Sequence, residues 1–367
     1  MKFSCEKDVI LKEITLAAEI ISSRNALSIL SNVYLEAGEN ELLIRATDLK
    51  VGFETRIPVD VQEAGTTTVY CDKFLGILRS LPSGEVEFEQ EAGDRFVIRP
   101  RFKKIDFRLK SISSEKYPEV QLAPEESYFD FPQSVLIGMI SQTIFAVSDD
   151  ETRYFMNGVF LENEQGKLVM VATDGRRLSY VSHTPEAPVP EFSGAIIPPK
   201  ILTLIRKLST GEGSVRMADA EKNIFVQFQN QRVSSALIEG QFPNYRRVIP
   251  ESQEHRILVK RSELQEALKR VSLLVEKSRR IYLTVNQDAI TLKSEETDIG
   301  QATEEISCQF DGPETTIALN FMYMMDPLRV MESEDITLLF TESNKADTRN
   351  PQHDANPFHI RKPMQLD

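Results

Sequence analysis

The side chains best suited to chemistry are scattered along this sequence instead of being grouped. The cysteines and histidines stand at Cys5, Cys71, Cys308, His183, His255, His353 and His359. No two of them have the spacing of zinc ligands, and no two cysteines are separated by only two residues. We therefore expect buried, reduced thiols, and we predict neither a metal site nor a cofactor.

The sequence also lacks the motifs of common catalytic sites. It has no phosphate-binding loop, no glycine-rich dinucleotide fingerprint, no nucleophile elbow and no HExxH zinc motif. Adjacent carboxylates, which can bind a metal or act as acid and base, occur at Asp149-Asp150, Glu295-Glu296 and Glu304-Glu305. On a chain with a formal net charge of −13 we expect these pairs to be solvated at the surface. The sequence thus predicts no catalytic residue and a protein that is not an enzyme.

Basic side chains are the remaining group that could bind a ligand. A net charge of −13 argues against nucleic-acid binding by the whole surface, but the distribution of Lys and Arg decides the local field. Predicted helical segments carry Lys7, Lys12, Lys73, Arg79, Lys200, Arg206, Lys207, Lys260, Arg261, Lys269 and Arg270, whereas residues 132–147 carry none. Two interpretations stay open: a basic helical face that binds phosphates, or charged helix faces that only solvate the protein.

An internal repeat organises the elements that carry these residues. An apolar helical pattern starts at Val9-Ile10, again at Val135-Leu136 and again near Leu264, about 126 to 128 residues apart. Ala46-Thr47-Asp48 likewise recurs as Ala172-Thr173-Asp174. The 367 residues therefore read as three copies of one unit, with predicted domains at 1–124, 125–250 and 251–367. Such a tandem triplet points to a protein whose shape is its function.

Each repeat is predicted to be α+β, with antiparallel sheets and two helices on one face. We expect helices over 7–22, 72–81, 133–147, 199–208 and 261–276, and another that begins near Asn320. The apolar run 167–173 predicts a strand buried on both faces, and Asp174-Gly175 predicts a hairpin turn after it. The polar segment 344–357 is typical of an exposed loop before a last strand.

Free sheet edges invite aggregation, so repeated units could join their sheets edge to edge and close the array. Closure needs either three units with threefold geometry or two chains that meet head to tail. Hydrophobic content of 41% and charged content of 27% are ordinary for globular proteins. No segment has the apolar length of a membrane span, and the N-terminal residues do not resemble a signal peptide, so a cytoplasmic protein is expected.

Several segments together resemble the bacterial β sliding clamp family, the processivity subunits of the replicative DNA polymerase III. The resemblance covers all three repeats. It is carried by residues 22–33 (SSRNALSILSNV), 153–159 (RYFMNGV), 172–178 (ATDGRRL), 240–250 (GQFPNYRRVIP) and 363–366 (PMQL).

The resemblance implies a head-to-tail homodimeric ring whose basic, helix-lined hole surrounds double-stranded DNA without reading its sequence. It also implies a pocket that holds short linear motifs of the polymerase, the clamp loader and other clamp-binding proteins. Carried over residue by residue, the pocket comprises Met156, Thr173, Gly175, Arg176, Arg177, Leu178, Pro243, Arg247, Val248, Tyr323, Ile360, Pro363, Met364 and Leu366. Without the resemblance, Met156 and Leu178 would be interpreted as core residues.

The resemblance further implies that Phe107 and Leu109 of one chain meet Ser272 and Leu273 of the other. The expected DNA-contacting residues are Arg24, Arg79, Tyr154, Lys200 and Arg206. Two features depart from the family pattern, namely Lys362 at the pocket rim and the polar segment 344–357. A second hypothesis remains, an acidic repeat scaffold that binds peptides but never encircles DNA. A third, an enzyme with a site between the repeats, has no supporting motif.

Overall fold

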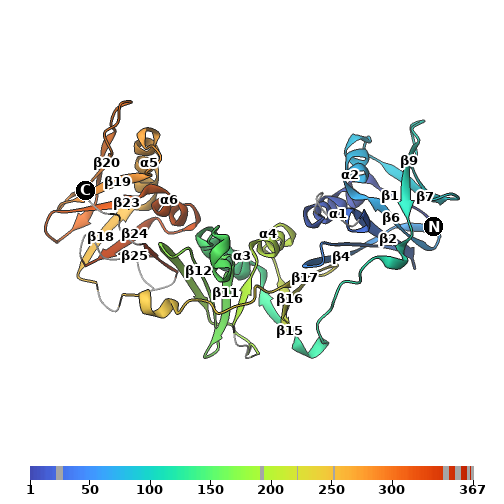
Figure 1. Ribbon diagram of the computed structural model, residues 1–367, viewed down its shortest axis with the longest axis horizontal. Coiled ribbons are helices and arrows are strands. Elements are labelled where there is room, and N and C mark those ends of the chain that lie inside the picture. Colours follow the sequence, from blue (N-terminus) through green and yellow to red (C-terminus); the bar gives the residue numbers. More distant parts are fainter. Residues whose placement is uncertain are drawn as a thin grey trace. The chain divides into compact units, whose positions relative to one another are not determined.

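The computed structural model describes residues 1–21, 28–190, 194–220, 222–250, 253–341, 347–351, 357–361 and 364, with residues 28, 347–351 and 361 described by their backbone (Figure 1). These residues form two compact units. The first unit comprises Met1–Gln133 and Thr203–Leu237, and the second comprises Ser134–Leu202 and Ile238–Asp367. The described strand pairs are antiparallel, as expected.

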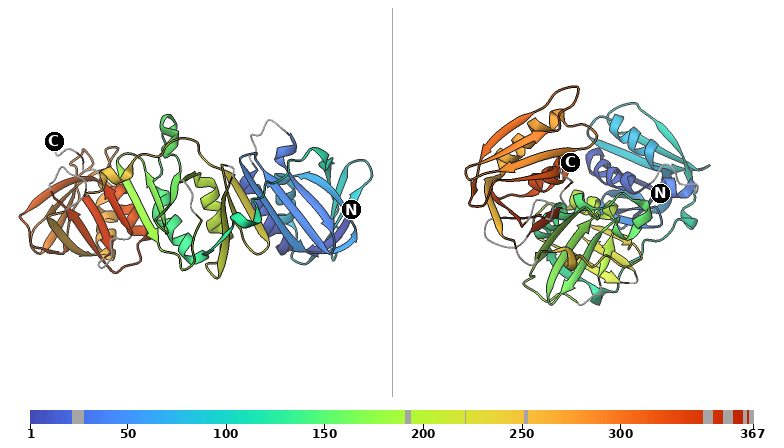
Figure 2. Two further views of the ribbon diagram at one scale, coloured as in Figure 1. Left: turned by 90° about the horizontal axis from the view of Figure 1, so that it is seen from below. Right: turned by 60° about the vertical axis from the view of Figure 1, so that its left-hand side comes forward.

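The first unit is built on one sheet of 13 strands in the order β10-β15-β16-β17-β4-β3-β2-β6-β9-β8-β7-β1-β5. Its strands are β1 (Lys2–Glu6), β2 (Asn32–Gly38), β3 (Glu41–Thr47), β4 (Val51–Pro58), β5 (Asp60–Glu63), β6 (Gly65–Tyr70), β7 (Glu85–Glu91), β8 (Arg95–Pro100), β9 (Phe107–Ile112), β10 (Phe129–Pro132), β15 (Ser214–Ala220), β16 (Asn223–Gln227) and β17 (Gln231–Ala236). Helices α1 (Lys7–Ile20) and α2 (Cys71–Ser80) pack against each other and cover part of this sheet (Figures 1 and 2).

The second unit contains two sheets, ordered β14-β11-β12-β13-β26-β25-β24-β18-β22 and β21-β20-β19-β23. Their strands are β11 (Val159–Glu164), β12 (Lys167–Thr173), β13 (Arg177–His183), β14 (Ala195–Ile197), β18 (His255–Lys260), β19 (Arg280–Val285), β20 (Ala289–Ser294), β21 (Thr303–Ser307), β22 (Gln309–Phe310), β23 (Thr315–Asn320), β24 (Asp335–Phe340), β25 (Asp347–Pro351) and β26 (Phe358–Arg361). Helices α5 (Arg261–Val271) and α6 (Phe321–Val330) pack together beside β19, β20 and β23 (Figure 1). The remaining helices are α3 (Gln133–Thr143) and α4 (Pro199–Leu208).

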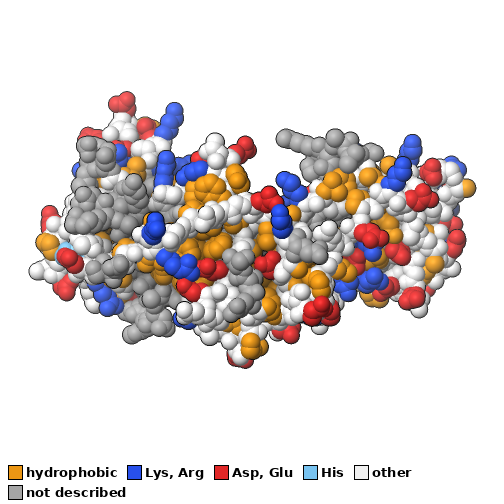
Figure 3. All heavy atoms as spheres, turned by 60° about the horizontal axis from the view of Figure 1, so that its bottom comes forward, with side chains coloured by type: hydrophobic (Ala, Val, Ile, Leu, Met, Phe, Trp, Pro, Cys, Tyr) orange, Lys and Arg blue, Asp and Glu red, His pale blue; other side chains and the backbone are white. Residues whose placement is uncertain are grey.

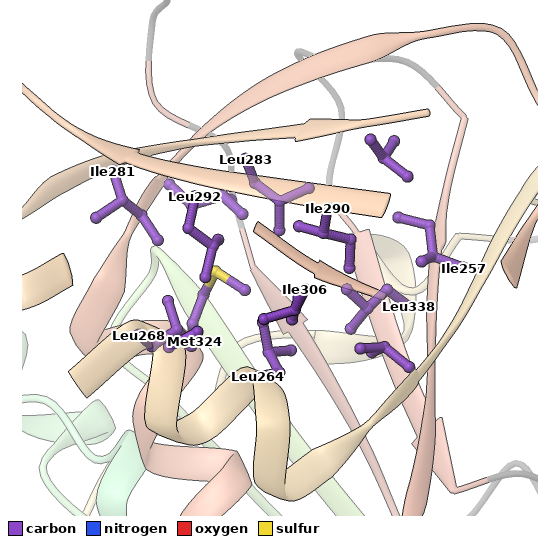
Figure 4. Close-up of a cluster of buried hydrophobic side chains, with 14 of the residues drawn as sticks. Ile257, Leu264, Leu268, Ile281, Leu283, Ile290, Leu292, Ile306, Met324 and Leu338 are labelled. Carbon is purple, nitrogen blue, oxygen red and sulfur yellow. The ribbon is translucent and has the colours of Figure 1, made fainter. Parts of the chain in front are cut away.

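A hydrophobic core of the third repeat lies between its two helices and strands of both sheets (Figure 4). Leu264 and Leu268 project from α5 and Met324 from α6 toward Leu283 and Leu292 of β19 and β20. The alternation of apolar and polar residues in these strands and the helical spacing in α5 both point their apolar side chains into this space. Among the described residues, no helix has the length and apolar character that a membrane span requires.

Repeats join edge to edge, as the repeat pattern predicted. In the first unit, β17 of the second repeat pairs with β4 of the first, with Ser234 opposite Gly52. In the second unit, β26 of the third repeat pairs with β13 of the second, with Ile360 opposite Leu178. Each pairing satisfies the backbone groups of two strands that would otherwise be exposed edges. These joins also explain why the second repeat contributes strands to both compact units.

Two predicted helices end earlier than expected. The helix predicted over 133–147 stops at Thr143, where the hydroxyl turns back to the carbonyls of Met139 and Ile140, and a 3-10 turn follows. The helix predicted over 261–276 stops at Val271 and also continues as a 3-10 turn. The apolar spacing runs on through both turns, so periodicity alone does not mark these ends.

The expectation that 344–357 is a loop is wrong for its middle part. Residues 347–351 form β25, which pairs with β24 on one side and β26 on the other. Residues 342–346 and 352–356 lie outside the described residues. Strand pairing uses backbone N–H and C=O groups, so a polar segment can pair without the apolar alternation that sequence analysis looks for.

Candidate functional site

An apolar cavity of about 440 Å³ lies in the second unit. Its lining residues are Met156, Thr173, Gly175, Arg176, Arg177, Leu178, Pro243, Asn244, Tyr245, Val248 and Ile360. They come from the 3-10 segment Glu151–Met156, the end of β12 with the turn into β13, the segment after β17, and β26. All except Asn244 and Tyr245 are residues that the sequence analysis proposed for a pocket. Asn244 and Tyr245 were not predicted, although both belong to segment 240–250, whose resemblance to the family could have indicated them as pocket residues.

The turn between β12 and β13 is fixed by its own side chains. The Thr173 hydroxyl donates to the carbonyl oxygen of Arg177 at 2.6 Å and accepts from the backbone N–H of Gly175 at 3.1 Å. Asp174 Oδ1 accepts the backbone N–H groups of Arg176 and Arg177 at 2.9 and 3.0 Å. Gly175 has φ of 84°, a left-handed conformation that disfavours any residue with a Cβ, and a Cβ there would also require Nη1 of Arg153 to move.

The guanidinium of Arg177 is held by hydrogen bonds and a ring contact within the protein. It donates to Asp174 Oδ2 at 3.1 Å, to Asp326 Oδ2 at 2.6 Å and to the Phe145 carbonyl oxygen at 2.6 Å. Its carbon Cζ lies 4.6 Å from the ring centroid of Tyr323. The side chain is only 13% exposed. Arg177 therefore forms a wall of the pocket, and each of its three guanidinium nitrogens already donates one hydrogen bond within the protein.

The pocket floor is apolar, while its rim is partly open. Met156, Leu178 and Ile360 are buried, whereas Val248 is 54% exposed. Beside them, the Tyr245 hydroxyl donates to Glu162, which also accepts from Arg246. Burial and the negative charge of Glu162 raise the pKa of Tyr245, so the phenol stays neutral. The arrangement can bury one or two apolar side chains of a ligand, each contributing about 1.5–3 kcal/mol.

Five predicted pocket residues are not among those that line this cavity. Arg247 is exposed in the 3-10 turn Tyr245–Val248, between two lining residues. The ring of Tyr323 stacks on the guanidinium of Arg177, so it supports this residue of the pocket wall without lining the cavity itself. The backbone N–H of Met364 donates to Ala318 at 2.8 Å. Pro363 and Leu366 lie outside the described residues, as does Lys362.

The described residues expected to contact DNA belong to both compact units, with Arg79 and Arg206 in the first and Tyr154 and Lys200 in the second. Arg79 on α2 and Lys200 and Arg206 on α4 are exposed. Tyr154 is also exposed, in the 3-10 segment Glu151–Met156. Arg24 lies outside the described residues. On the face shown in Figure 3, Lys and Arg side chains are interspersed with Asp and Glu side chains.

The residues expected at a dimer interface belong to β9 and to the 3-10 turn Ser272–Leu274, and Leu273 is the most exposed of them. Phe107 and Leu109 are half-buried on β9. Ser272 and Leu273 belong to the 3-10 turn after α5, and Leu273 is 81% exposed. Phe102 and Ile299 are similarly exposed, at 83% and 73%, so the exposure of Leu273 does not by itself mark an interface.

The acidic pairs were expected to be solvated at the surface. Asp149, Glu296 and Glu305 are indeed exposed, whereas the other carboxylate of each pair binds an arginine. Asp150 binds Arg153, Glu295 binds Arg280 and Glu304 binds Arg270. The pKa of Glu304 is lowered, chiefly by its hydrogen bond with Arg270. Among the described residues, no group of three or more His, Cys, Asp or Glu side chains could hold a metal ion.

The cysteines are free, and burial raises the pKa of Cys5 and of Cys71 to about 12. The prediction of buried thiols is confirmed for Cys71, whereas Cys5 and Cys308 are half-buried. Thiols with such a raised pKa are poor nucleophiles near neutral pH.

Comparison with known proteins places this geometry in a family. Models of the N-terminal, central and C-terminal domains of the DNA polymerase III beta subunit match residues 1–121, 130–244 and 246–365. The chain is 45% identical to the beta sliding clamp of Treponema pallidum and 30% identical to that of Escherichia coli K12, with 100% of each chain covered.

Solved structures agree over the whole length of the chain. The DNA polymerase sliding clamp of Bacillus subtilis matches with a TM-score of 0.94 at 27% identity, and 100% of both chains is covered. The sliding clamp of Pseudomonas aeruginosa bound to griselimycin matches with a TM-score of 0.93 at 29% identity, also over 100% of both chains. With three tandem domain matches and full-length relatives, the chain belongs to the DNA polymerase III beta subunit family of bacterial sliding clamps.

Proposed function

We propose that this chain is a sliding clamp, which encircles duplex DNA and tethers the replicative polymerase to it. The observation that carries the proposal is the full-length membership of the family, with all three domain models in tandem. The protein would act as a non-catalytic processivity factor in the cytoplasm. Its clamp domains would span 1–124, 125–250 and 251–367.

The ring would form from two chains that meet head to tail. Edge-to-edge strand pairing already joins the repeats within each compact unit, through β4–β17 and through β13–β26. The same kind of contact between β9 of one chain and the third repeat of another would close the ring. The half-buried Phe107 and the exposed Leu273 are apolar side chains suited to such an interface.

DNA binding would rest on backbone phosphates and not on base contacts. Arg24, Arg79, Lys200 and Arg206, with Tyr154, would face the duplex. Lys and Arg contacts to phosphate are independent of sequence and weaken as salt rises, so they permit sliding. Topology, and not affinity, would then keep the clamp on DNA.

The apolar cavity would bind short linear motifs of the polymerase, the clamp loader and other partners. Its volume of about 440 Å³ and its apolar floor suit the anchor side chains of a peptide. Arg247, Tyr323, Pro363, Met364 and Leu366 would extend the site beyond the described cavity.

A double substitution tests the pocket. We expect Met364→Ala with Leu366→Ala to weaken binding of a polymerase-derived motif peptide, measured by fluorescence anisotropy, while the mass in solution remains that of a dimer. Arg79→Ala, on α2 and outside the cavity, is the matched control and should leave peptide affinity unchanged. Equal peptide affinity of the double variant and the unaltered protein would remove the pocket assignment. The competing hypothesis, a peptide-binding scaffold that never encircles DNA, predicts instead that the protein is lost equally from circular and from linear DNA.

A further inference from the structure

Helix α4 presents three cations on its exposed side. Its apolar residues at 201, 202, 204, 205 and 208 are buried, whereas Lys200, Arg206 and Lys207 are exposed. Lys200 and Lys207 are separated by about two helical turns, so they lie on the same stripe of the helix surface. Lys207 is therefore as well placed as Lys200 to meet a phosphate, although it was not among the residues expected to contact DNA.

The charge of Lys207 is already paired within the chain. Its Nζ donates to both carboxylate oxygens of Glu19 on α1, at 2.7 and 2.8 Å. The Lys207 side chain is 49% exposed and that of Glu19 is 36% exposed, so the pair lies at the surface. By contrast, the side chains of Arg206 and Arg79 form no ion pair within the described part of the chain. One cation of α4 is thus neutralised by the protein, while its neighbour keeps its charge available.

The position of Glu19 is not explained by the stability of its own helix. The C-terminal end of a helix carries partial negative charge, so an acidic residue in the last turn is disfavoured. Glu19 lies in the last turn of α1, which contains no basic residue. Among the described residues, Lys207 is the only hydrogen-bond or ion-pair partner of the Glu19 carboxylate. The favourable role of this carboxylate is therefore its effect on Lys207.

We propose that Glu19 weakens the binding of duplex DNA by holding Lys207, so that one cation of α4 is withheld from the DNA phosphates. The inference rests on the proposed function, in which the cations of α4 face the duplex. A ring that slides must hold phosphates loosely, and every additional Lys–phosphate contact raises the affinity and its dependence on salt. A surface ion pair is weak, but its carboxylate cancels the local field of Lys207 before a phosphate arrives.

The test measures the affinity of a short fluorescent DNA duplex by anisotropy while the salt concentration is raised. The full-length protein is compared with Glu19→Gln, with the double variant Glu19→Gln and Lys207→Gln, and with Glu119→Gln. Glu119 is an exposed residue between β9 and β10 whose carboxylate forms no ion pair within the described part of the chain. Glu119→Gln therefore removes the same charge without releasing a cation.

We expect Glu19→Gln to bind the duplex about two- to fivefold more tightly than the unaltered protein at low salt, because the released Lys207 gains one phosphate contact. The slope of log affinity against log salt should become steeper by about 0.9 for that contact. Addition of Lys207→Gln should remove the gain, and Glu119→Gln should bind like the unaltered protein. Thermal unfolding and peptide affinity should be the same for all variants, which checks that each of them folds.

Unchanged duplex affinity in Glu19→Gln would overturn the inference and leave the sliding-clamp proposal standing. An equal gain in Glu119→Gln would also overturn it, because net charge alone would then be the cause. A gain that persists in the double variant would overturn it as well, since Lys207 would not be the cation released. Equal loss of the unaltered protein from circular and linear DNA would overturn the sliding-clamp proposal and this inference together.

Discussion

At the residue scale, the first and second repeats contain the same turn, but a different residue occupies its position of positive φ. In the first repeat, Thr47 donates to the Val51 carbonyl oxygen, and Asp48 accepts the N–H groups of Lys50 and Val51. This pattern matches the Thr173 and Asp174 turn at the pocket. The left-handed position is Gly175 in the second repeat, with φ of 84°, and Leu49 in the first, with φ of 74°. Leu49 is 63% exposed, so it gains little burial in return for its backbone strain.

Leu49→Gly is therefore expected to stabilise the protein or leave it unchanged. A left-handed conformation costs a residue with a Cβ about 1–2 kcal/mol, which glycine avoids, while glycine loses about 0.5–1 kcal/mol through the unfolded state. Urea unfolding measures the free energy of unfolding. The control is Leu122→Gly, at a residue that is 52% exposed and has no positive φ. It should be destabilised by about 0.5–1 kcal/mol. An equal loss of stability in both variants would contradict the argument.

The sequence predicted this turn from local residue patterns, and it predicted most of the pocket residues from the family resemblance. The recurrence of Ala-Thr-Asp and the Asp174-Gly175 dipeptide predicted the hairpin from local chemistry alone. Met156 and Leu178 looked like core residues and are buried, so only the family resemblance marked them as pocket lining. The internal use of Arg177 could not be predicted, because its partner Asp326 lies far along the chain, on α6.

At the scale of elements, a comparison of the two edge-to-edge strand pairings explains why the pairing of β13 with β26 lies beside an open cavity. At the second join, Leu178 of β13 faces Ile360 of β26, and both line the pocket. The equivalent position at the first join is Gly52, opposite Ser234. A Cβ at Gly52 would lie 2.8 Å from the Ser234 hydroxyl and 2.9 Å from Cγ1 of Val120. The chain's own Val120 thus packs against the position that corresponds to the pocket floor.

Gly52→Ala should destabilise the first unit. The added methyl group would meet Val120 and Ser234 in a packed interior, and such overpacking costs about 1–3 kcal/mol. Gly38→Ala is the matched control, since a Cβ there has nothing within 4 Å. Thermal and urea unfolding of both variants measure the difference. Equal stability of Gly52→Ala and Gly38→Ala would show that Val120 and Ser234 do not fill the space beside Gly52.

The ion pair between Arg177 of β13 and Asp326 of α6 connects the second and third repeats behind the pocket. Both side chains are largely buried, so Asp326→Asn leaves Arg177 with a weakened partner in a poorly solvated place. We expect a loss of about 1–3 kcal/mol in the free energy of unfolding, and weaker peptide binding because the pocket wall loosens. Asp326→Glu should restore part of the binding, which a loss of stability alone would not predict.

Glu332→Gln, at an exposed residue just after α6, serves as the control for a lost negative charge. It should change neither stability nor peptide affinity measurably. Peptide binding by Asp326→Asn at the unaltered affinity would show that Arg177 does not need Asp326 to shape the pocket.

At the scale of the whole molecule, the sequence predicted three repeats, and the structure arranges their strands into two compact units. The repeat count followed from periodicity, which each repeat carries by itself. The division into units depends on which strand edges pair across repeats, and local sequence carries no signal for that choice. Strand β25 also could not be predicted locally, because its polar sequence lacks the apolar alternation of a strand while its backbone pairs with β24 and β26.

The central claim is that topology holds this protein on DNA despite its net charge of −13. The most direct measurement loads the protein with a clamp loader onto nicked circular DNA, linearises half of the sample with a restriction enzyme, and separates bound from free protein by gel filtration. We predict that the circular DNA retains the protein and that the linear DNA releases it as the ring slides off the ends. Equal loss from both DNAs, or equal retention on both, would contradict the sliding-clamp account.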